Sequence, residues 1–354
     1  MERSPRLYGR AHHDTAPCTV DERRVIMSPA PLASLMPPGN MDLKQIQYFI
    51  ALFEDGSVTR AAKRLHIVQP ALSMQIAKLE DELHQQLFER GADGMAPTAA
   101  GRLMYRLFLP IMRDLAHARQ QLVQRDEVVT GHVGIGLIAS VTESVLADSL
   151  SRFHARYPHV EVTIADGYSA TFIDWVAGGQ LDAAIINKPR ARLSLDSRPM
   201  LDEEMVLATS AAHGPDLPRA IELAQLPELE LVLPTKRHGL RGVLDSAAQH
   251  EDVLLAPRFE IDVLSTILKL VEHTRFATIL PRIVVERAAR HGTLRACPIL
   301  APRIVRHILC VSHPRRPLSA AAEALIATIG DELHRASAIT GDESSKDTKE
   351  PHRH

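Results

Sequence analysis

The sequence predicts an α+β multidomain protein: a small N-terminal domain built on short helices, one long linker helix, and a C-terminal domain of two α/β lobes. Short helical patterns fill residues 41–98, and one apolar stripe at helical spacing runs through residues 99–128. Over residues 131–336, apolar strands alternate with amphipathic helices, as in α/β lobes. With 354 residues and 45% apolar composition, the chain is long enough for several separate cores.

The composition predicts a cytoplasmic protein that holds no metal and no cofactor. No apolar run approaches the roughly 20 residues of a membrane-spanning helix, so we expect no membrane partner. The N-terminus lacks the apolar core of a signal peptide. The three cysteines, Cys18, Cys297 and Cys310, are too few and too scattered for a disulfide framework or a structural zinc site.

Both ends of the chain are predicted to be disordered. Residues 1–40 hold six prolines and no sustained apolar periodicity, so we expect a flexible extension there. The folded part is predicted to begin near Met41. The closing stretch GDESSKDTKEPHRH is polar and has no aromatic residue, which predicts a disordered tail over residues 337–354.

Two short helices joined by a tight turn are predicted after residue 56. Ser57 is a suitable N-cap for the first, whose apolar side is formed by Val58, Ala61, Ala62 and Leu65. The second is expected to start at Pro70, because proline is favoured at the first position of a helix. Its apolar residues recur at intervals of four, three and four and form one stripe: Leu72, Ile76, Leu79 and Leu83.

Positive charge is concentrated on this helix pair. Residues 57–79 carry four basic residues and no acid, although residues 41–98 as a whole hold six Lys or Arg against eight Asp or Glu. A helix pair of this kind is typical of a helix-turn-helix, in which the basic part meets DNA phosphates. The alternative is a solvated helical hairpin with ordinary surface charge.

In a helix-turn-helix, the second helix enters the major groove with its N-terminus first. Gln69 can then pair with adenine, Ser73 can bond to several bases, and Pro70 or Met74 can touch a thymine methyl group. The predicted contacts to the sugar-phosphate backbone come from Thr59, Arg60, Lys63 and Arg64, with Ser57 and Lys78 completing the set.

The stretch from Met41 to Gly101 resembles the winged helix-turn-helix of LysR-type transcriptional regulators. It reads MDLKQIQYFIALFEDGSVTRAAKRLHIVQPALSMQIAKLEDELHQQLFERGADGMAPTAAG, with S-x-T-x-A-A-x-x-L, Q-P-A-L-S-x-Q-I, L-E-x-x-L, L-F-x-R and P-T-x-A-G in order. The resemblance implies a first helix at about Leu43 to Asp55, and a wing at about Arg90 to Pro97 in which Arg90 contacts DNA. It also implies sequence-specific binding to double-stranded promoter DNA.

Three positions depart from the family pattern. Met74 stands where the family often has Arg, so a strong guanine contact is missing. His84 replaces the common Gly after the recognition helix and must adopt left-handed cap geometry. Asp93 is acidic where the wing usually carries a second basic residue, which leaves Arg90 to make the wing contact.

The next segment, from Thr98 to Glu127, is predicted to be one helix of about 30 residues, roughly 45 Å long. Pro110 is expected to kink it. Its coiled-coil-like spacing predicts pairing with a second copy of the chain, as a dimer or tetramer. The resemblance implies the same, whereas the alternative is that the stripe packs on its own domain. The stripe consists of Leu103, Leu107, Ile111, Leu115, Ala118 and Leu122.

The C-terminal half is predicted to form two α/β lobes around a mostly parallel sheet. Strands are expected in GHVGIGLIAS and at Val160–Ala165, Asp182–Ile186, Leu231–Leu233, Pro257–Ile261, Phe276–Leu280, Leu294–Cys297 and Arg306–Val311. Helices are expected at Glu143–Tyr157, Phe172–Ala177, Gly239–His250, Val263–His273, Arg282–Arg290 and Leu318–Ala336. This layout resembles the effector domain of the same family, whose lobes are similar to periplasmic binding proteins.

A small, anionic effector is predicted at the carboxyl ends of the strands, near helix N-termini. The candidate hydroxyls are Ser140, Thr142, Ser169 and Thr235, and the resemblance implies inducer contacts at the first, third and fourth of these. Each hydroxyl has an alternative role as a helix cap. Arg241 and Lys236 either neutralise a carboxylate or lie in solvent.

The predicted function is therefore sequence-specific transcriptional regulation modulated by a small molecule. An effector-independent DNA-binding or DNA-bending regulator is the first alternative. An α/β enzyme is the second, but the sequence has no H-E-x-x-H, no G-x-S-x-G and no phosphate loop, so we predict no catalytic residues.

Two other patterns are not interpreted as functional sites. The G-x-G-x-x-A of residues 134–139 matches the dinucleotide-binding fingerprint, but it falls within a predicted strand rather than after it. Cys297 and Cys310 are interpreted as buried thiols rather than redox sensors.

Overall fold

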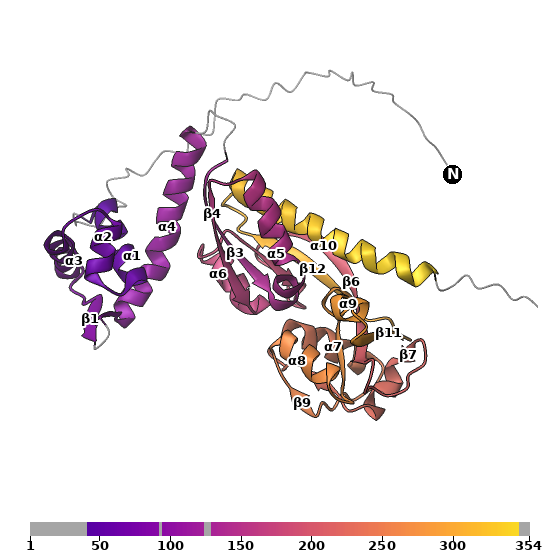
Figure 1. Ribbon diagram of the computed structural model, residues 1–354. Helices are drawn as coiled ribbons and strands as arrows, with labels where there is room; N and C mark the ends of the chain where they lie inside the picture. The colour runs from indigo at the N-terminus through magenta and orange to yellow at the C-terminus, as the bar shows by residue number, and fades with distance from the viewer. Residues whose placement is uncertain (1–40, 92–93, 124–128, 347–354) are drawn as a thin grey trace, which may run out of the picture.

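A computed structural model describes residues 41–91, 94–123 and 129–346, and Figure 1 shows their arrangement. The predicted extension over residues 1–40 lies outside these residues, as do Asp93, residues 124–128 and residues 347–354. Within the described part, no helix is long and apolar enough to cross a membrane.

The N-terminal domain is a three-helix unit followed by a hairpin. Its elements are α1 (Leu43–Asp55), α2 (Val58–Arg64), α3 (Gln69–Leu83), β1 (Phe88–Gly91) and β2 (Gly94–Pro97). The first helix occupies the predicted residues, and the two strands pair antiparallel as the predicted wing. The helix α3 begins at Gln69 rather than Pro70, because Val68 has the extended backbone of the N-cap. Leu83 is 37% exposed, so the buried stripe of α3 ends at Leu79.

The linker helix α4 (Ala99–Val123) is continuous through Pro110, and the expected kink stays a prediction. Four residues of its apolar stripe are between 43% and 55% exposed: Leu103, Leu107, Ile111 and Leu115. The alternative in which this stripe packs on its own domain is therefore wrong at these positions. Two contacts join α4 to the first lobe, because Asp114 pairs with Arg316 at 2.9 Å and Arg113 donates to the backbone oxygen of Gln180.

The C-terminal half forms the two predicted lobes, each with its own buried core. Lobe I contains β3 (Gly131–Ile138), α5 (Ala139–Arg156), β4 (Val160–Gly167), α6 (Ser169–Ala177), β5 (Ala183–Asn187) and α10 (Ala320–Lys346). Lobe II contains β7 (Ile221–Glu222), η2 (Leu223–Glu228), β8 (Val232–Leu233), α7 (Gly239–His250), β9 (Phe259–Glu260), α8 (Leu264–Glu272), β10 (Ala277–Pro281), α9 (Arg282–Arg290) and β11 (Leu294–Leu300).

Two long strands cross between the lobes, β6 (Asp196–Ser210) and β12 (Val305–Ser312). The first part of β6 pairs with β12, and the part from Met205 onward pairs with β10 and β11 of lobe II. The strand order is β4-β3-β5-β12-β6-β11-β7, with β10 also paired to β6. The lobes therefore share one pair of strands, about which they can be positioned relative to each other.

Several sequence predictions need correction. The sheet is mixed rather than mostly parallel, because β6 and β12 run antiparallel to their neighbours. The strand β6 was not predicted, and its first half is polar and largely exposed. The helix α5 starts at Ala139, so Ser140 and Thr142 lie inside it, and Ser169 is the first residue of α6 rather than its predecessor. The predicted tail begins too early, because α10 continues to Lys346.

Candidate functional site

The candidate DNA-binding surface is the exposed side of α3. Gln69, Pro70, Ser73 and Lys78 are exposed on this helix, and Met74 is 63% exposed. Leu72 and Leu79 face the opposite way, into the domain core. Thr59 Oγ1 on α2 donates to Gln69 Oε1 over 3.3 Å, so the two helices present one continuous polar surface.

The predicted phosphate-contacting residues differ in how free their side chains are. Lys63 is exposed and has no carboxylate partner among the described residues. The Arg60 guanidinium donates to the backbone oxygen of Asp55. Arg64 forms ion pairs with Glu54 at 2.9 Å and with Asp55 at 3.5 Å. Both arginines must give up these partners to reach phosphate. The Arg64–Glu54 pair is exposed, so breaking it costs little free energy.

Ser57 and the wing are held by local hydrogen bonds. Ser57 is half-buried, and its hydroxyl accepts from the Arg60 backbone N–H at 3.5 Å as the N-cap of α2. Gly56 ends α1 in the left-handed region with a φ of 58°, and its carbonyl accepts from the Met95 N–H in the wing at 2.9 Å. Arg90 is exposed on β1, opposite Met95.

The residue Glu80 connects the recognition helix to the wing. Its carboxylate accepts from the backbone N–H of Leu87 at 2.7 Å and of Phe88 at 3.1 Å. His84 ends α3 with a φ of 49° and a ψ of 36°, which is the left-handed geometry expected for this position. These contacts fix the wing relative to α3, so the two can contact DNA together.

Between the lobes, the buried Arg306 is the centre of a hydrogen-bond network. Arg306 on β12 faces its cross-strand partner Glu203 on β6, with Nε and Nη2 at 2.9 and 2.5 Å from one carboxylate oxygen. Its Nη1 donates to Ser140 Oγ at 2.7 Å and to Asn187 Oδ1 at 3.4 Å. Glu203 in turn accepts from the Ile283 N–H at the start of α9, at 2.7 Å. The network therefore joins both lobes to both crossover strands.

A cavity of about 850 Å³ opens between the lobes and is the candidate effector site. This volume is typical of sites for small organic ligands. The lobe I wall comes from the start of α6 and the residues after β5, and the lobe II wall comes from the loop before α7 and from α7 itself. Its polar lining includes Ser169, Asn187, Lys188, Arg190, Lys236, Arg237 and His238.

Of the four predicted effector hydroxyls, Ser169 lines this cavity. Ser140 is fully buried and its hydroxyl contacts Arg306, while Thr142 Oγ1 donates to Asp166 at 3.0 Å. Thr235 lies just before the cavity-lining loop, and its hydroxyl accepts from the Arg237 N–H at 3.3 Å. Ser169 is therefore the one predicted hydroxyl residue in the cavity lining, and its hydroxyl, like the other three, has a structural partner, because it accepts from the Asn187 N–H at 3.3 Å.

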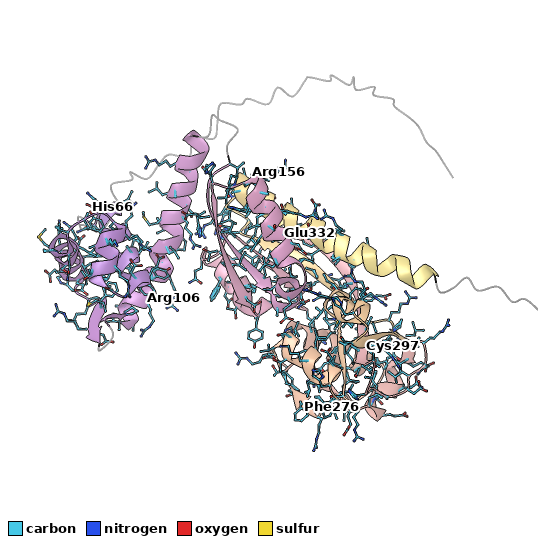
Figure 2. The ribbon with its side chains drawn as sticks, in the orientation of Figure 1. His66, Arg106, Arg156, Phe276, Cys297 and Glu332 are labelled. Carbon is cyan, nitrogen blue, oxygen red and sulfur yellow. The ribbon has the colours of Figure 1, made fainter. Side chains whose placement is uncertain are left out.

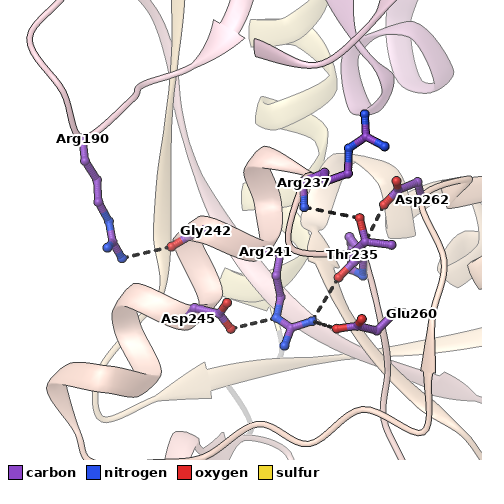
Figure 3. Close-up of polar contacts among 9 residues, drawn as sticks. Arg190, Thr235, Arg237, Arg241, Gly242, Asp245, Glu260 and Asp262 are labelled. Carbon is purple, nitrogen blue, oxygen red and sulfur yellow. Dashed lines mark hydrogen bonds and ion pairs between the residues drawn. The ribbon is translucent and has the colours of Figure 1, made fainter. Parts of the chain in front are cut away.

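Neither alternative for Arg241 is correct. Its side chain is 4% exposed and forms ion pairs with Asp245 at 2.7 Å and with Glu260 at 2.6 Å, as Figure 3 shows. It also donates to the carbonyl of Pro234 at 3.2 Å. Arg241 therefore holds α7 to β9 and to the end of β8, and it is not among the residues that line the cavity. Lys236, by contrast, is exposed and lines the cavity.

His238 was not predicted, although it lines the cavity and is buried. Its Nδ1 accepts from the Leu240 N–H at 3.2 Å, which makes the imidazole the N-cap of α7. Burial, assisted by the charge of Arg306, lowers the pKa of His238, while Asp262 opposes this. A ring nitrogen that accepts a hydrogen bond is unprotonated, so both effects favour neutral His238.

The two cysteines of the described residues lie in different cores. Cys297, labelled in Figure 2, is in lobe II, and Cys310 is in lobe I. Burial raises the pKa of the Cys297 thiol, and it raises that of Cys310 to about 11. Since the thiolate is the reactive form, this environment favours inert apolar side chains over redox sensors.

A winged helix-turn-helix joined to a two-lobed domain with a central cavity defines a ligand-responsive DNA-binding protein. The family model "Bacterial regulatory helix-turn-helix protein, lysR family" matches residues 43–102, and the model "LysR substrate binding domain" matches residues 126–334. The chain belongs to the LysR family. It is a transcriptional regulator rather than an enzyme, and its partners are promoter DNA, a small-molecule effector and further copies of itself.

Named relatives agree with this assignment. The nitrogen assimilation regulatory protein nac of Klebsiella aerogenes is 30% identical over 252 residues, which cover 71% of this chain and 80% of that protein. The hydrogen peroxide-inducible genes activator of Pectobacterium carotovorum subsp. carotovorum is 28% identical over 297 residues, covering 83% and 97%.

Solved structures share the fold. A full-length OxyR variant from Pseudomonas aeruginosa has a TM-score of 0.67 at 24% identity, over 82% of this chain and 94% of that one. Full-length CbnR complexed with its target DNA has a TM-score of 0.59 at 20% identity, over 84% and 100%.

Proposed function

We propose that this chain binds an interrupted palindrome in promoter DNA by inserting α3 into the major groove. The observation that carries this proposal is the exposed side of α3, where Gln69, Ser73 and Met74 lie beside one another at its N-terminal end. Gln69 and Ser73 supply hydrogen bonds to base edges, and Pro70 and Met74 supply apolar contact with thymine. Lys63, the arginines of α2 and Arg90 in the wing neutralise phosphates.

The recognition unit works as a pair. The exposed apolar stripe of α4 supports pairing with a second copy, because four large aliphatic side chains on one helix face have no cover within the described residues. A two-fold dimer presents two α3 helices to two half-sites, and two dimers give a tetramer.

Since the target is chromosomal DNA, the chain acts in the cytoplasm.

A small anionic molecule in the inter-lobe cavity changes how the paired chains engage DNA. The support is the position of the cavity between two lobes that share the crossover strands. A ligand that touches both walls alters the angle between the lobes. The buried network around Arg306 lies beside this cavity, because its partner Asn187 lines the cavity wall.

The recognition assignment is tested with Gln69→Ala in a gel-shift titration on a promoter fragment protected by the wild-type protein. Loss of a bidentate base contact is expected to weaken specific binding by ~1–3 kcal/mol, with little change on random DNA. Gln249→Ala is the matched control, because Gln249 is an exposed glutamine on α7, far from α3 in the chain. Unchanged specific affinity in Gln69→Ala would refute this assignment.

A further inference from the structure

We propose that the effector of this chain is a dicarboxylate with an apolar body, held with one carboxylate on each lobe. This inference rests on the proposed binding of a small anion in the inter-lobe cavity and specifies its chemical class. The distribution of charge around the cavity carries it.

Each lobe contributes one pair of cations to the cavity lining, and a fifth cation, Arg303, pairs with Glu204 at 3.0 Å. Lys188 and Arg190 follow the carboxyl end of β5 in lobe I, and Lys236 and Arg237 follow that of β8 in lobe II. None of the four has a carboxylate partner among the described residues. Arg190 instead reaches across the cavity and donates to the backbone oxygen of Gly242 over 3.4 Å, as Figure 3 shows.

The acids of the cavity lining, Asp245 and Glu251, are fewer than these four cations. Asp245 shares the buried Arg241 with Glu260, at 2.7 and 2.6 Å, so this group keeps one negative charge on the α7 wall. Glu251 follows the last residue of α7, and the 12-residue length of that helix puts it about 18 Å from the helix N-terminus. Four cations against two lining acids leave the cavity with excess positive charge. A ligand with one negative group would balance only part of this excess, whereas a dianion can place one charge at each cation pair.

Backbone dipoles add to the attraction at both ends. The helices α6 and α7 start at the cavity with Ser169 and Gly239, one from each lobe. Tyr168, the N-cap of α6, provides no side-chain hydrogen bond to the first turn. Helix N-termini stabilise anions, so each wall combines a cation pair with a positive helix end.

The rest of the cavity lining is largely apolar. It includes Ile173 on α6, Val243 and Ala247 on α7, and Pro302, Ile304 and Val305 just before and at the start of β12. A ligand that fits must therefore carry a hydrocarbon chain or ring between its charged ends. The segments NKPR and TKRH offer cationic side chains rather than the glycine-rich backbone loop that holds nucleotide phosphates, and we assign a carboxylate to each charged end.

The test is isothermal titration calorimetry of the full-length protein with two matched pairs of ligands at constant ionic strength. Adipate is compared with hexanoate, and terephthalate with benzoate. We expect at least one dicarboxylate to bind about tenfold or more tightly than its monocarboxylate partner. Equal affinities within both pairs, or no dicarboxylate binding up to about 10 mM, would overturn the inference.

Two double variants locate the charged ends. Lys188→Ala with Arg190→Ala removes the lobe I pair, and Lys236→Ala with Arg237→Ala removes the lobe II pair. Each is expected to reduce dicarboxylate affinity to that of the monocarboxylate, because one carboxylate loses its partners. Lys269→Ala on α8 is the control, since this exposed lysine lines a different surface and should leave binding unchanged. A double variant that keeps the dicarboxylate preference would contradict the two-ended arrangement.

Failure of this inference is distinguishable from failure of the proposed function. Wild-type protein that protects promoter DNA but shows no dicarboxylate preference contradicts the ligand class alone. A protein that binds dicarboxylates through both cation pairs yet does not bind promoter DNA contradicts the proposed function and leaves the ligand class supported.

Discussion

Substitution of Arg306 by Met is predicted to destabilise the effector domain more than any exposed arginine substitution. Arg306 and Glu203 have side chains that are 0% and 4% exposed, and they are joined by two hydrogen bonds of 2.9 and 2.5 Å. Removing Arg306 leaves a buried carboxylate without its cation and removes the donor to Ser140 and Asn187. Breaking a buried pair in this way costs about 3–5 kcal/mol.

The assay is equilibrium unfolding of the full-length protein in urea, followed by fluorescence. The single tryptophan of the chain, Trp175, lies on α6 and reports on lobe I. Arg303→Met is the matched control, because Arg303 lies two residues before β12, is 69% exposed and pairs with Glu204 at 3.0 Å. An exposed pair of this kind contributes about 0–1 kcal/mol.

A double variant separates the charge from the volume of the side chain. Arg306→Met with Glu203→Leu removes both charges, so it should cost less than the single Arg306 variant. Part of the loss should persist, because the Ile283 N–H then lacks its acceptor. Equal free energies of unfolding for Arg306→Met and Arg303→Met would refute the account of this network.

Two further predictions concern pH and assembly. Burial lowers the folded-state pKa of His238 below its ordinary value of 6.5. The stability contributed by the neutral cap is therefore complete above about pH 6.5 and is lost as the pH falls through the lowered pKa. Urea unfolding at several pH values should show this loss in the wild type and a smaller loss in His238→Asn. Leu107→Glu should raise the dimer dissociation constant about 100-fold in sedimentation equilibrium, because each copy loses ~1.5 kcal/mol or more of apolar burial. Leu254→Glu is the control, because this position in lobe II is 81% exposed and the substitution should leave the dissociation constant unchanged.

Local sequence signals predicted the N-terminal domain well, because each of its helix caps and packing contacts involves residues close together in the chain. Ser57 caps α2, and the small residues Ala61 and Ala62 permit close packing, so both helix pairing and polarity can be inferred from spacing. The start of α3 was misplaced by one residue because proline is tolerated throughout the first turn of a helix, and Pro70 occupies its second position.

The effector domain was predicted less completely because its defining contacts connect residues far apart in the chain. Ser140 follows a strand and has the pattern of a ligand contact, yet its partner Arg306 lies 166 residues away. An arginine within a strand gives no sequence signal that it will be buried. The cations at Lys188 and Arg190 follow β5 and could be inferred from strand position alone, whereas the cap formed by His238 could not.

The central claim is that this chain is a promoter-binding regulator switched by a small molecule in the inter-lobe cavity. The most direct measurement is a nuclease footprint on the DNA upstream of its own gene, repeated with a panel of small carboxylates and amino acids. The account predicts protection of a two-fold symmetric site whose length changes with a dicarboxylate. Protection that no compound alters would contradict the switch, and absence of any protection would contradict recognition of that promoter.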